Sequence, residues 1–292
     1  MSFTDYLENG FDRLETLLPL ALVPFFSTFL HFDNLRKATT ISGYHFGATF
    51  RFPTAIPTFW TFVSLPNGPS GVHVSPLLFL APVTIIVESV LSAGYLGSVR
   101  DAVETGDYDF ARNAKEYFLP LLGYTALVWV VLLLSFSVGV VFPPLLFVAL
   151  PVLLVLSYLF YGAPFLVVVD DRSLGEALRR SNRLARGESN TETTYASFGI
   201  GYLVFVFVAS IVGTLFINFG IFGIVVGALV SAPVAVALTA AAVEFFIDVR
   251  RSSSGTVPAV SGPSDGSIGE HPTDSNRTDN NPNGDDPFDG EY

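Results

Sequence analysis

Long apolar runs alternate with shorter polar stretches along most of the chain. An apolar run of about 18 or more residues with few charges is long enough to cross a bilayer as a helix. Six such runs predict spans at about residues 14–30, 75–99, 117–139, 145–169, 196–216 and 221–246. The expected fold class is therefore all-α, a polytopic integral membrane bundle of about six transmembrane helices.

The first of these runs is the most irregular. Pro19 and Pro24 each remove a backbone hydrogen bond, which a membrane helix tolerates where its neighbours satisfy the freed groups. Before this run, one face of a helix over residues 3–14 gathers the apolar side chains Phe3, Leu7, Phe11 and Leu14. Residues 3–14 are thus either a short helix at the membrane surface or a plain polar N-terminus.

Residues 31–73 form a long connection between the first two spans. The basic residues Arg36, Lys37 and Arg51 and several prolines and glycines argue against a span here. Residues 44–52 alternate polar and aromatic positions, as a short strand or hairpin does. Because aromatic rings favour the membrane interface, we expect this connection to fold back onto it.

The composition changes abruptly after residue 250. Residues 251–292 are rich in Ser, Gly, Pro, Asn and Asp, and residues 252–292 carry eight acidic residues against one basic residue. Such a segment cannot bury enough apolar surface to fold, so we predict a disordered acidic tail after a membrane domain at residues 1–250. The net charge of −11 makes nucleic acid an unfavourable partner. Acid excess with only two lysines is typical of a saline cytoplasm, although an acidic tail alone gives a similar balance.

The basic residues predict an orientation. If the N-terminus is cytoplasmic, twelve Arg and Lys residues lie on the cytoplasmic side and three lie outside. Because cytoplasmic loops of membrane proteins carry an excess of Arg and Lys, we expect a multi-pass protein of the cell membrane with both termini in the cytoplasm.

Glu88 lies well inside the second predicted span. An ionisable side chain at that depth costs about 2.5–3.5 kcal/mol on insertion scales and marks a candidate functional site. No Lys, Arg or His lies inside any predicted span to pair with it. Glu88 is either a carboxylate that couples to protons or cations, or a structural acid buried in the bundle.

Residues 173–187 predict a basic amphipathic helix. Ser173 and Glu176 have the spacing of a capping box, and Gly187 suits the end of the helix. Apolar residues recur on one face, and the other faces carry the four arginines Arg179, Arg180, Arg183 and Arg186. Either this helix contacts anionic lipid headgroups, or it is a connector that packs beneath the bundle.

Small residues recur at intervals of four in the sixth span, at Gly223, Gly227 and Ser231. Such stripes allow close helix packing, here more readily within one chain than in a dimer. The chain has no Cys, and its His and Asp residues follow no metal-ligand spacing. We therefore expect no metal, no cofactor and no enzymatic activity.

Two stretches carry a resemblance to a known family. The first combines residues 93–97, 106–110 and 117–120, and the second is residues 164–171 followed by a Glu-Ala-Leu-Arg-Arg-Ser sequence at 176–181. Both are similar to six-span prokaryotic membrane proteins that resemble the membrane domain of glycerophosphoryl diester phosphodiesterases. The resemblance would cover residues 15–250 and implies a fold and a membrane location. It does not imply the phosphodiesterase activity, because the chain has no room for that soluble barrel.

Two functions remain open from the sequence. The first is a non-enzymatic scaffold that binds the bilayer, its anionic headgroups or other membrane proteins. The second is a small permease or transporter subunit that uses Glu88 in an intramembrane cavity.

Overall fold

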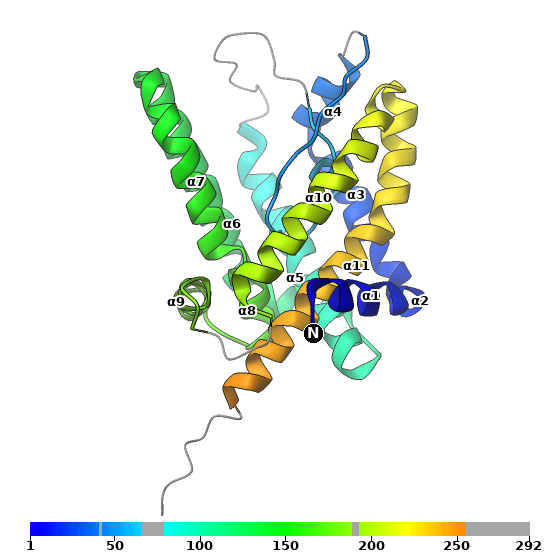
Figure 1. Ribbon diagram of the computed structural model, residues 1–292, viewed down its shortest axis with the longest axis vertical. Coiled ribbons are helices and arrows are strands. Elements are labelled where there is room, and N and C mark those ends of the chain that lie inside the picture. Colours follow the sequence, from blue (N-terminus) through cyan, green and yellow to red (C-terminus); the bar gives the residue numbers. More distant parts are fainter. Residues whose placement is uncertain (41–42, 66–78, 189–192, 255–292) are drawn as a thin grey trace, which may run out of the picture. The chain divides into compact units, whose positions relative to one another are not determined.

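The described part of the chain is built from helices. The computed structural model describes residues 1–40, 43–65, 79–188 and 193–254, and these ranges contain α- and 3₁₀-helices but no strand (Figure 1). The elements are α1 (Phe3–Asp12), α2 (Leu14–Leu17), η1 (Leu18–Ala21), α3 (Leu22–Leu30), α4 (Phe32–Thr39), η2 (Phe59–Phe62), α5 (Ala81–Thr105), α6 (Phe110–Val141), η4 (Pro143–Leu145), α7 (Leu146–Phe160), α8 (Ala163–Val169), α9 (Leu174–Ala185), α10 (Tyr195–Ile217) and α11 (Gly220–Ser254). The all-α fold class is confirmed. Residues 251–254, which were predicted as the start of the disordered tail, continue α11 as helix, and the rest of the predicted tail lies outside the described residues.

Within these ranges, five helical stretches are long and apolar enough to cross a membrane. They are Ala81–Thr105, Phe110–Ser135, Phe147–Val169, Tyr195–Ile217 and Gly220–Ser253. A sixth is obtained if α1 is counted with the helical stretch Leu14–Leu30, from which it is bent by 61°. The fold is therefore a membrane bundle of five to six spans.

The second span is displaced from its predicted position. Helix α5 begins at Ala81, and residues 75–78 lie outside the described part. The helix then continues past residue 99 to Thr105, because its charged last turn finds partners on neighbouring helices. Gly106 ends it at a φ of 83°, a left-handed conformation that glycine adopts without a steric penalty.

The N-terminal segment is a helix that packs across the bundle. A capping box between Ser2 and Asp5 begins α1, and the backbone N–H of Ser2 lowers the pKa of the Asp5 carboxyl. Tyr6 and Gly10 of α1 are buried, and Phe3 and Leu7 of the predicted apolar face pack partly buried against the core, whereas Phe11 is exposed. The Tyr6 hydroxyl donates to Asp248 of α11 at 3.0 Å, which fixes α1 against that helix.

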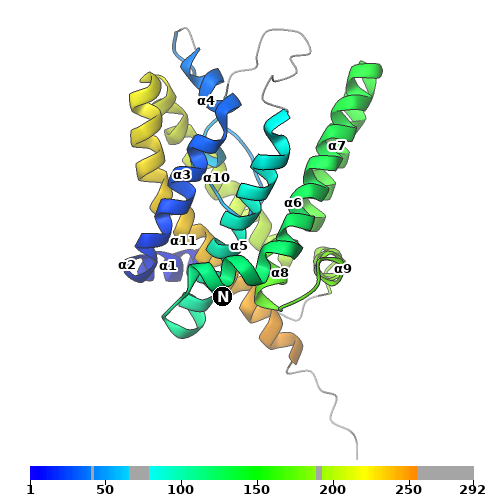
Figure 2. The same cartoon turned by 180° about the vertical axis from the view of Figure 1, so that it is seen from behind.

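The two ends of the bundle are easily told apart. One end, called the loop end below, holds α4 and the connection between α10 and α11 (Figures 1 and 2). The opposite end holds α1, α9 and the connection between α5 and α6, and it is called the network end after the polar side-chain network described in the next subsection. The paired helices α6 and α7 lean away from the other helices toward the loop end. Many apolar side chains of α7 are accordingly exposed, including Phe147, Val148, Leu150, Val152, Leu154 and Val155.

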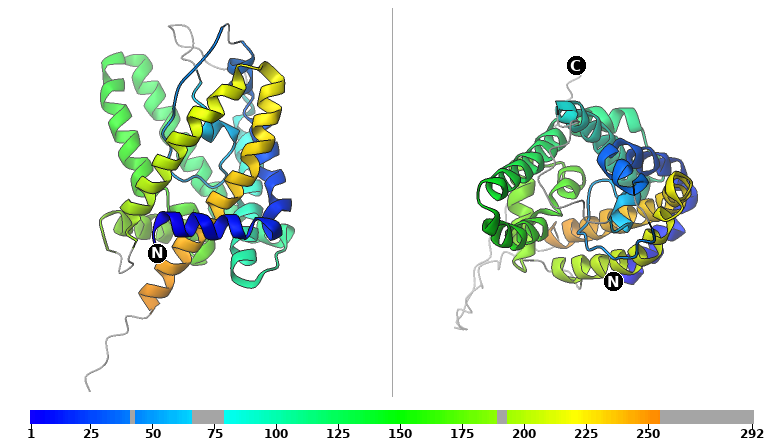
Figure 3. Two further views of the ribbon diagram at one scale, coloured as in Figure 1. Left: turned by 45° about the vertical axis from the view of Figure 1, so that its right-hand side comes forward. Right: turned by 90° about the horizontal axis from the view of Figure 1, so that it is seen from above.

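The connection between α4 and α5 enters the bundle instead of lying at the interface. In Figure 3 its extended part passes among the helices, and η2 follows it. Phe59, Trp60 and Phe62 are at most 3% exposed, and the Trp60 indole Nε1 donates to the Thr28 carbonyl of α3 at 2.7 Å. The expectation of an interfacial loop is therefore wrong for these residues, and residues 44–52 form no strand.

Polar side chains of α10 explain how this irregular backbone is tolerated inside the bundle. Asn218, Thr214 and Ser210 recur at intervals of four on one helical face. Their side-chain oxygens accept the backbone N–H groups of His45 at 2.6 Å, of Ser64 at 2.9 Å and of Thr49 at 2.9 Å, respectively. Irregular backbone at membrane depth requires such partners, because lipid supplies none.

Candidate functional site

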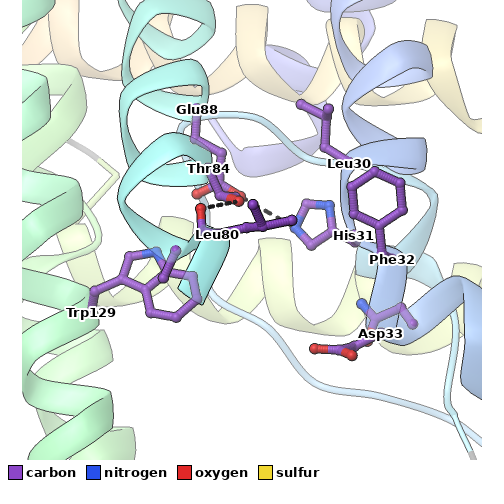
Figure 4. Close-up of a pocket in the computed structure, with 10 residues that line it drawn as sticks. Leu30, His31, Phe32, Asp33, Leu80, Thr84, Glu88 and Trp129 are labelled. Atoms are coloured by element: carbon purple, nitrogen blue, oxygen red, sulfur yellow. Dashed lines mark hydrogen bonds and ion pairs between the residues drawn. The ribbon is translucent and has the colours of Figure 1, made fainter. Parts of the chain in front are cut away.

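Glu88 faces a histidine that the sequence places just beyond the first span. Glu88 lies seven residues after the start of α5, which is about 10 Å along the helix axis from its first residue. His31 ends α3, and its Nε2 is 3.8 Å from Glu88 Oε1 (Figure 4). Glu88 thus has a basic partner, which the sequence did not reveal because helix packing brings residues 31 and 88 together.

The hydrogen bonding of His31 restricts where a proton can reside. Its Nδ1 lies 2.9 Å from the Ser27 carbonyl, which can only accept, so Nδ1 carries a hydrogen. A second proton at Nε2 then makes the ring an imidazolium beside an ionised Glu88. Without it, the Nε2 lone pair faces the Glu88 carboxyl. A proton between the two residues can therefore reside either on Nε2 of His31 or on Glu88.

This pair lines a pocket of about 260 Å³ near the loop end. The walls come from the end of α3, the start of α4, the start of α5 and Trp129 of α6, and Figure 4 shows the Glu88 and His31 side chains pointing toward each other. The side chain of Glu88 is 25% exposed and that of His31 is 37% exposed. Glu88 is thus accessible from the pocket, whose volume accommodates several water molecules or a small solute.

Helix α9 lies across the network end and has the predicted amphipathic character. Ser173 accepts a hydrogen bond from the backbone N–H of Glu176, and Ala177, Ser181 and Leu184 form its buried face. Arg179, Arg183 and Arg186 are exposed. Arg180 instead turns inward, where its Nε lies 3.0 Å from Asp170 Oδ2.

We expect exposed arginines of α9 to increase binding to anionic membranes. In the full-length protein reconstituted at fixed orientation in nanodiscs, replacing Arg179, Arg183 and Arg186 with Gln should reduce recruitment of anionic vesicles several-fold, since each Arg near such a surface contributes about 1 kcal/mol. The measurement is vesicle co-flotation at low and physiological salt. An unchanged recruitment would contradict lipid contact, and Arg36→Gln at the other end of the bundle is the matched control.

The small-residue stripe of α11 contacts other parts of the same chain. A Cβ on Gly223 would collide with the Phe216 carbonyl of α10, and one on Gly227 would collide with the Phe59 ring of η2. Ser231 lines an apolar groove between α10 and α11. These contacts agree with the intramolecular packing that the stripe suggested.

A buried polar network at the network end was not singled out from the sequence. Asp101 of α5 is 8% exposed, and its Oδ2 accepts from Arg112 at 2.8 Å and from Asn113 at 2.7 Å. Arg100 lies 3.0 Å from the other oxygen of Asp101 and donates to Tyr117 at 2.8 Å. The available sequence signal for this network was the adjacent pair Arg100 and Asp101 at the end of an apolar run.

The network continues to α8 and α11. Tyr117 donates to Asp171 at 2.6 Å, and Asp171 has a φ of 49°, which sharply redirects the chain after α8. Arg250 of α11 donates to the Val169 carbonyl at 2.5 Å and pairs with Glu104 of α5. Because each charge has a partner of opposite sign, this network stabilises the meeting point of four helices and offers no open site.

The fold defines the class of protein, a multi-span helical membrane protein. Comparison with protein-family models, with curated proteins and with solved structures finds no match to this chain. The resemblance to phosphodiesterase-associated membrane domains therefore stays a prediction. In the described ranges no three His, Asp or Glu side chains converge as metal ligands, and His73 lies outside those ranges.

Proposed function

We propose that this protein is a permease or a permease subunit that binds a small cation, such as a protonated amine, in the pocket of Glu88 and His31. The observation that supports it is an accessible carboxylate that faces an imidazole in a pocket lined by three of the apolar helices. An ionisable residue at membrane depth is rarely retained without a role in binding or translocation.

A proton held by Glu88 or His31 would give the pocket a means of coupling. A bound cation stabilises ionised Glu88 and disfavours a second positive charge on His31, so cation binding should release the proton to the solution. Release of the cation allows the proton to return. The pocket would thus exchange one proton for one cation. With the orientation that the basic residues predict, the loop end and its pocket face the outside of the cell.

A scaffold that binds lipid or partner proteins is the second candidate function. It is supported by the exposed Arg179, Arg183 and Arg186 of α9, at the end of the bundle that the orientation places in the cytoplasm. It does not require the Glu88 pocket. The two candidates are therefore separated by substitutions at Glu88, which only the permease depends on.

Glu88→Gln is expected to abolish cation-dependent proton movement. Wild-type protein in proteoliposomes that contain a pH-sensitive dye should change the internal pH when K⁺, guanidinium or trimethylammonium is added outside. Gln preserves the shape of Glu but cannot ionise, so at least about 90% of the signal should disappear, as expected for the loss of an essential proton carrier. Glu8→Gln, on the exposed face of α1, is the matched control and should behave as wild type.

Two results would reject the permease. The first is a wild-type protein that moves no protons with any of the cations. The second is a Glu88→Gln variant that equals wild type while remaining folded, as judged by its elution volume and thermal unfolding.

A further inference from the structure

The pocket that holds Glu88 and His31 has an aromatic wall from α6. Trp129 of that helix lines the same pocket, and in Figure 4 the Glu88 carboxyl lies between the Trp129 and His31 rings. The neighbouring side chains of Val128 and Val130 on α6 are exposed, whereas Trp129 is partly buried. The indole therefore faces the bundle and the pocket instead of the exposed side of α6.

The charged side chains around the pocket favour a cation. Asp33, near the start of α4, is a second acid on its wall, and His31 is the basic side chain among the described residues that line it. When Glu88 and Asp33 are ionised, the pocket is negative whether or not His31 carries a second proton. A negative pocket attracts cations and repels anions.

The other walls suit an organic cation better than a metal ion. They are apolar and come from Leu30, Phe32, Leu80 and Ala81. Hard metal cations prefer several oxygen ligands, and in the described part of the chain no three His, Asp or Glu side chains converge to hold one. The pocket volume of about 260 Å³ also far exceeds the roughly 30 Å³ that one water molecule occupies in the liquid, so a metal ion would leave most of the pocket to water.

From this combination of charge and apolar surface we propose that the pocket selects organic ammonium ions with apolar substituents on the nitrogen, and that Trp129 sets this selectivity. The inference rests on the cation-binding function proposed above and names its substrate class. Glu88 pairs with the positive charge. The indole of Trp129 covers the substituents and attracts the cation through its π-system, for which Trp is the most effective side chain.

The charge and the apolar substituents contribute separately to binding. A carboxylate attracts any monovalent cation, so Glu88 alone does not separate K⁺ from an alkylated ammonium ion. Each methyl group on the nitrogen adds apolar surface that the indole and its apolar neighbours remove from water. Affinity should therefore rise with the number of methyl groups at constant charge, and this rise should depend on Trp129.

The test uses the purified full-length protein in nanodiscs, titrated calorimetrically with K⁺, methylammonium and trimethylammonium at one neutral pH and one ionic strength. Wild type should bind trimethylammonium most tightly, then methylammonium, then K⁺. The first and last should differ by about tenfold or more, the scale of a partly desolvated contact between a cation and an aromatic ring. Glu88→Gln should weaken the binding of all three ions.

Trp129→Leu keeps an apolar wall and removes the aromatic ring. It should weaken trimethylammonium binding by about fivefold or more and leave K⁺ binding within about twofold of wild type. Trp129→Phe retains a ring with a weaker attraction for cations and should give an intermediate affinity. Val130→Ala is the matched control, because Val130 is an exposed neighbour on the same helix that does not line the pocket.

The outcomes separate this inference from the function on which it rests. Wild type that binds none of the three ions rejects the permease and the selectivity together. Binding that depends on Glu88 but shows no preference for trimethylammonium over K⁺ overturns the selectivity and leaves the permease standing. A preference that folded Trp129→Leu and Trp129→Phe both retain in full overturns the role of Trp129. The wild-type order of affinities needs no substitution, so it decides the substrate class even if a variant does not fold.

Discussion

Replacing Asp170 with Ala should destabilise the folded protein by about 3–5 kcal/mol, the usual cost of removing one partner of a buried ion pair. The Asp170 side chain is 3% exposed, and its Oδ2 lies 2.9 Å from Arg172 Nε and 3.0 Å from Arg180 Nε. Arg180 is itself only 13% exposed, so removing the carboxylate leaves a buried positive charge without its partner. The junction of α8 with α9 should loosen first.

Thermal unfolding in detergent, followed by tryptophan fluorescence, measures this effect. Glu188→Gln is the matched control, because Glu188 pairs with Arg183 at 4.0 Å and both side chains are about 60% exposed. Exposed pairs contribute about 0–1 kcal/mol, so this control should unfold close to wild type. Equal unfolding temperatures for Asp170→Ala and Glu188→Gln would show that Asp170 is not a structural anchor.

Gly213→Ala should displace η2 from the core at a cost of about 1–3 kcal/mol, as for other overpacked interiors. A Cβ at this position of α10 would collide with the Phe62 carbonyl oxygen. The obstacle is backbone rather than the end of a flexible side chain, so it cannot yield without moving η2. Trp60, which is 1% exposed and bonds to Thr28, should then become accessible to water.

The fluorescence of Trp60 in a Trp129→Phe background reports this movement, since Trp60 and Trp129 are the two tryptophans of the chain. We expect a red shift and faster quenching by iodide in Gly213→Ala. Gly175→Ala is the control: nothing lies within 4 Å of a Cβ there, and alanine favours a helix. If Trp60 emission stays unchanged in Gly213→Ala, the close contact between α10 and η2 does not determine the position of the loop.

The apolar runs determined the fold class and the approximate number of spans. The physical reason is local: a helix must cover the bilayer thickness with apolar side chains, whatever its neighbours are. Local chemistry also determined where the amphipathic helix α9 forms, because the capping residues and the apolar periodicity at residues 173–187 act without tertiary contacts. The boundary of α5 was less accurate, since its charged last turn is stabilised by partners elsewhere in the fold, among them Arg112 of α6, Asp171, and Arg250 of α11.

The depth of residues 43–65 was decided only by the tertiary structure. Their polar and aromatic pattern suits an interface equally well, and the buried position depends on hydroxyl and amide groups of α10 more than 140 residues away in sequence. Ser210, Thr214 and Asn218, four residues apart in an apolar helix, were the available sequence signal.

Glu88 also shows which features the sequence determined and which features only the tertiary structure decided. Its position inside an apolar run was enough to mark it as a candidate, because the cost of an ionisable group in lipid is a property of the sequence and the bilayer. Its pairing with His31 and the pocket around both required α3, α4, α5 and α6 to be placed side by side. The sequence by itself determined which segments enter the membrane. The tertiary structure decided which polar groups meet there, because such meetings depend on packing between helices that are distant along the chain.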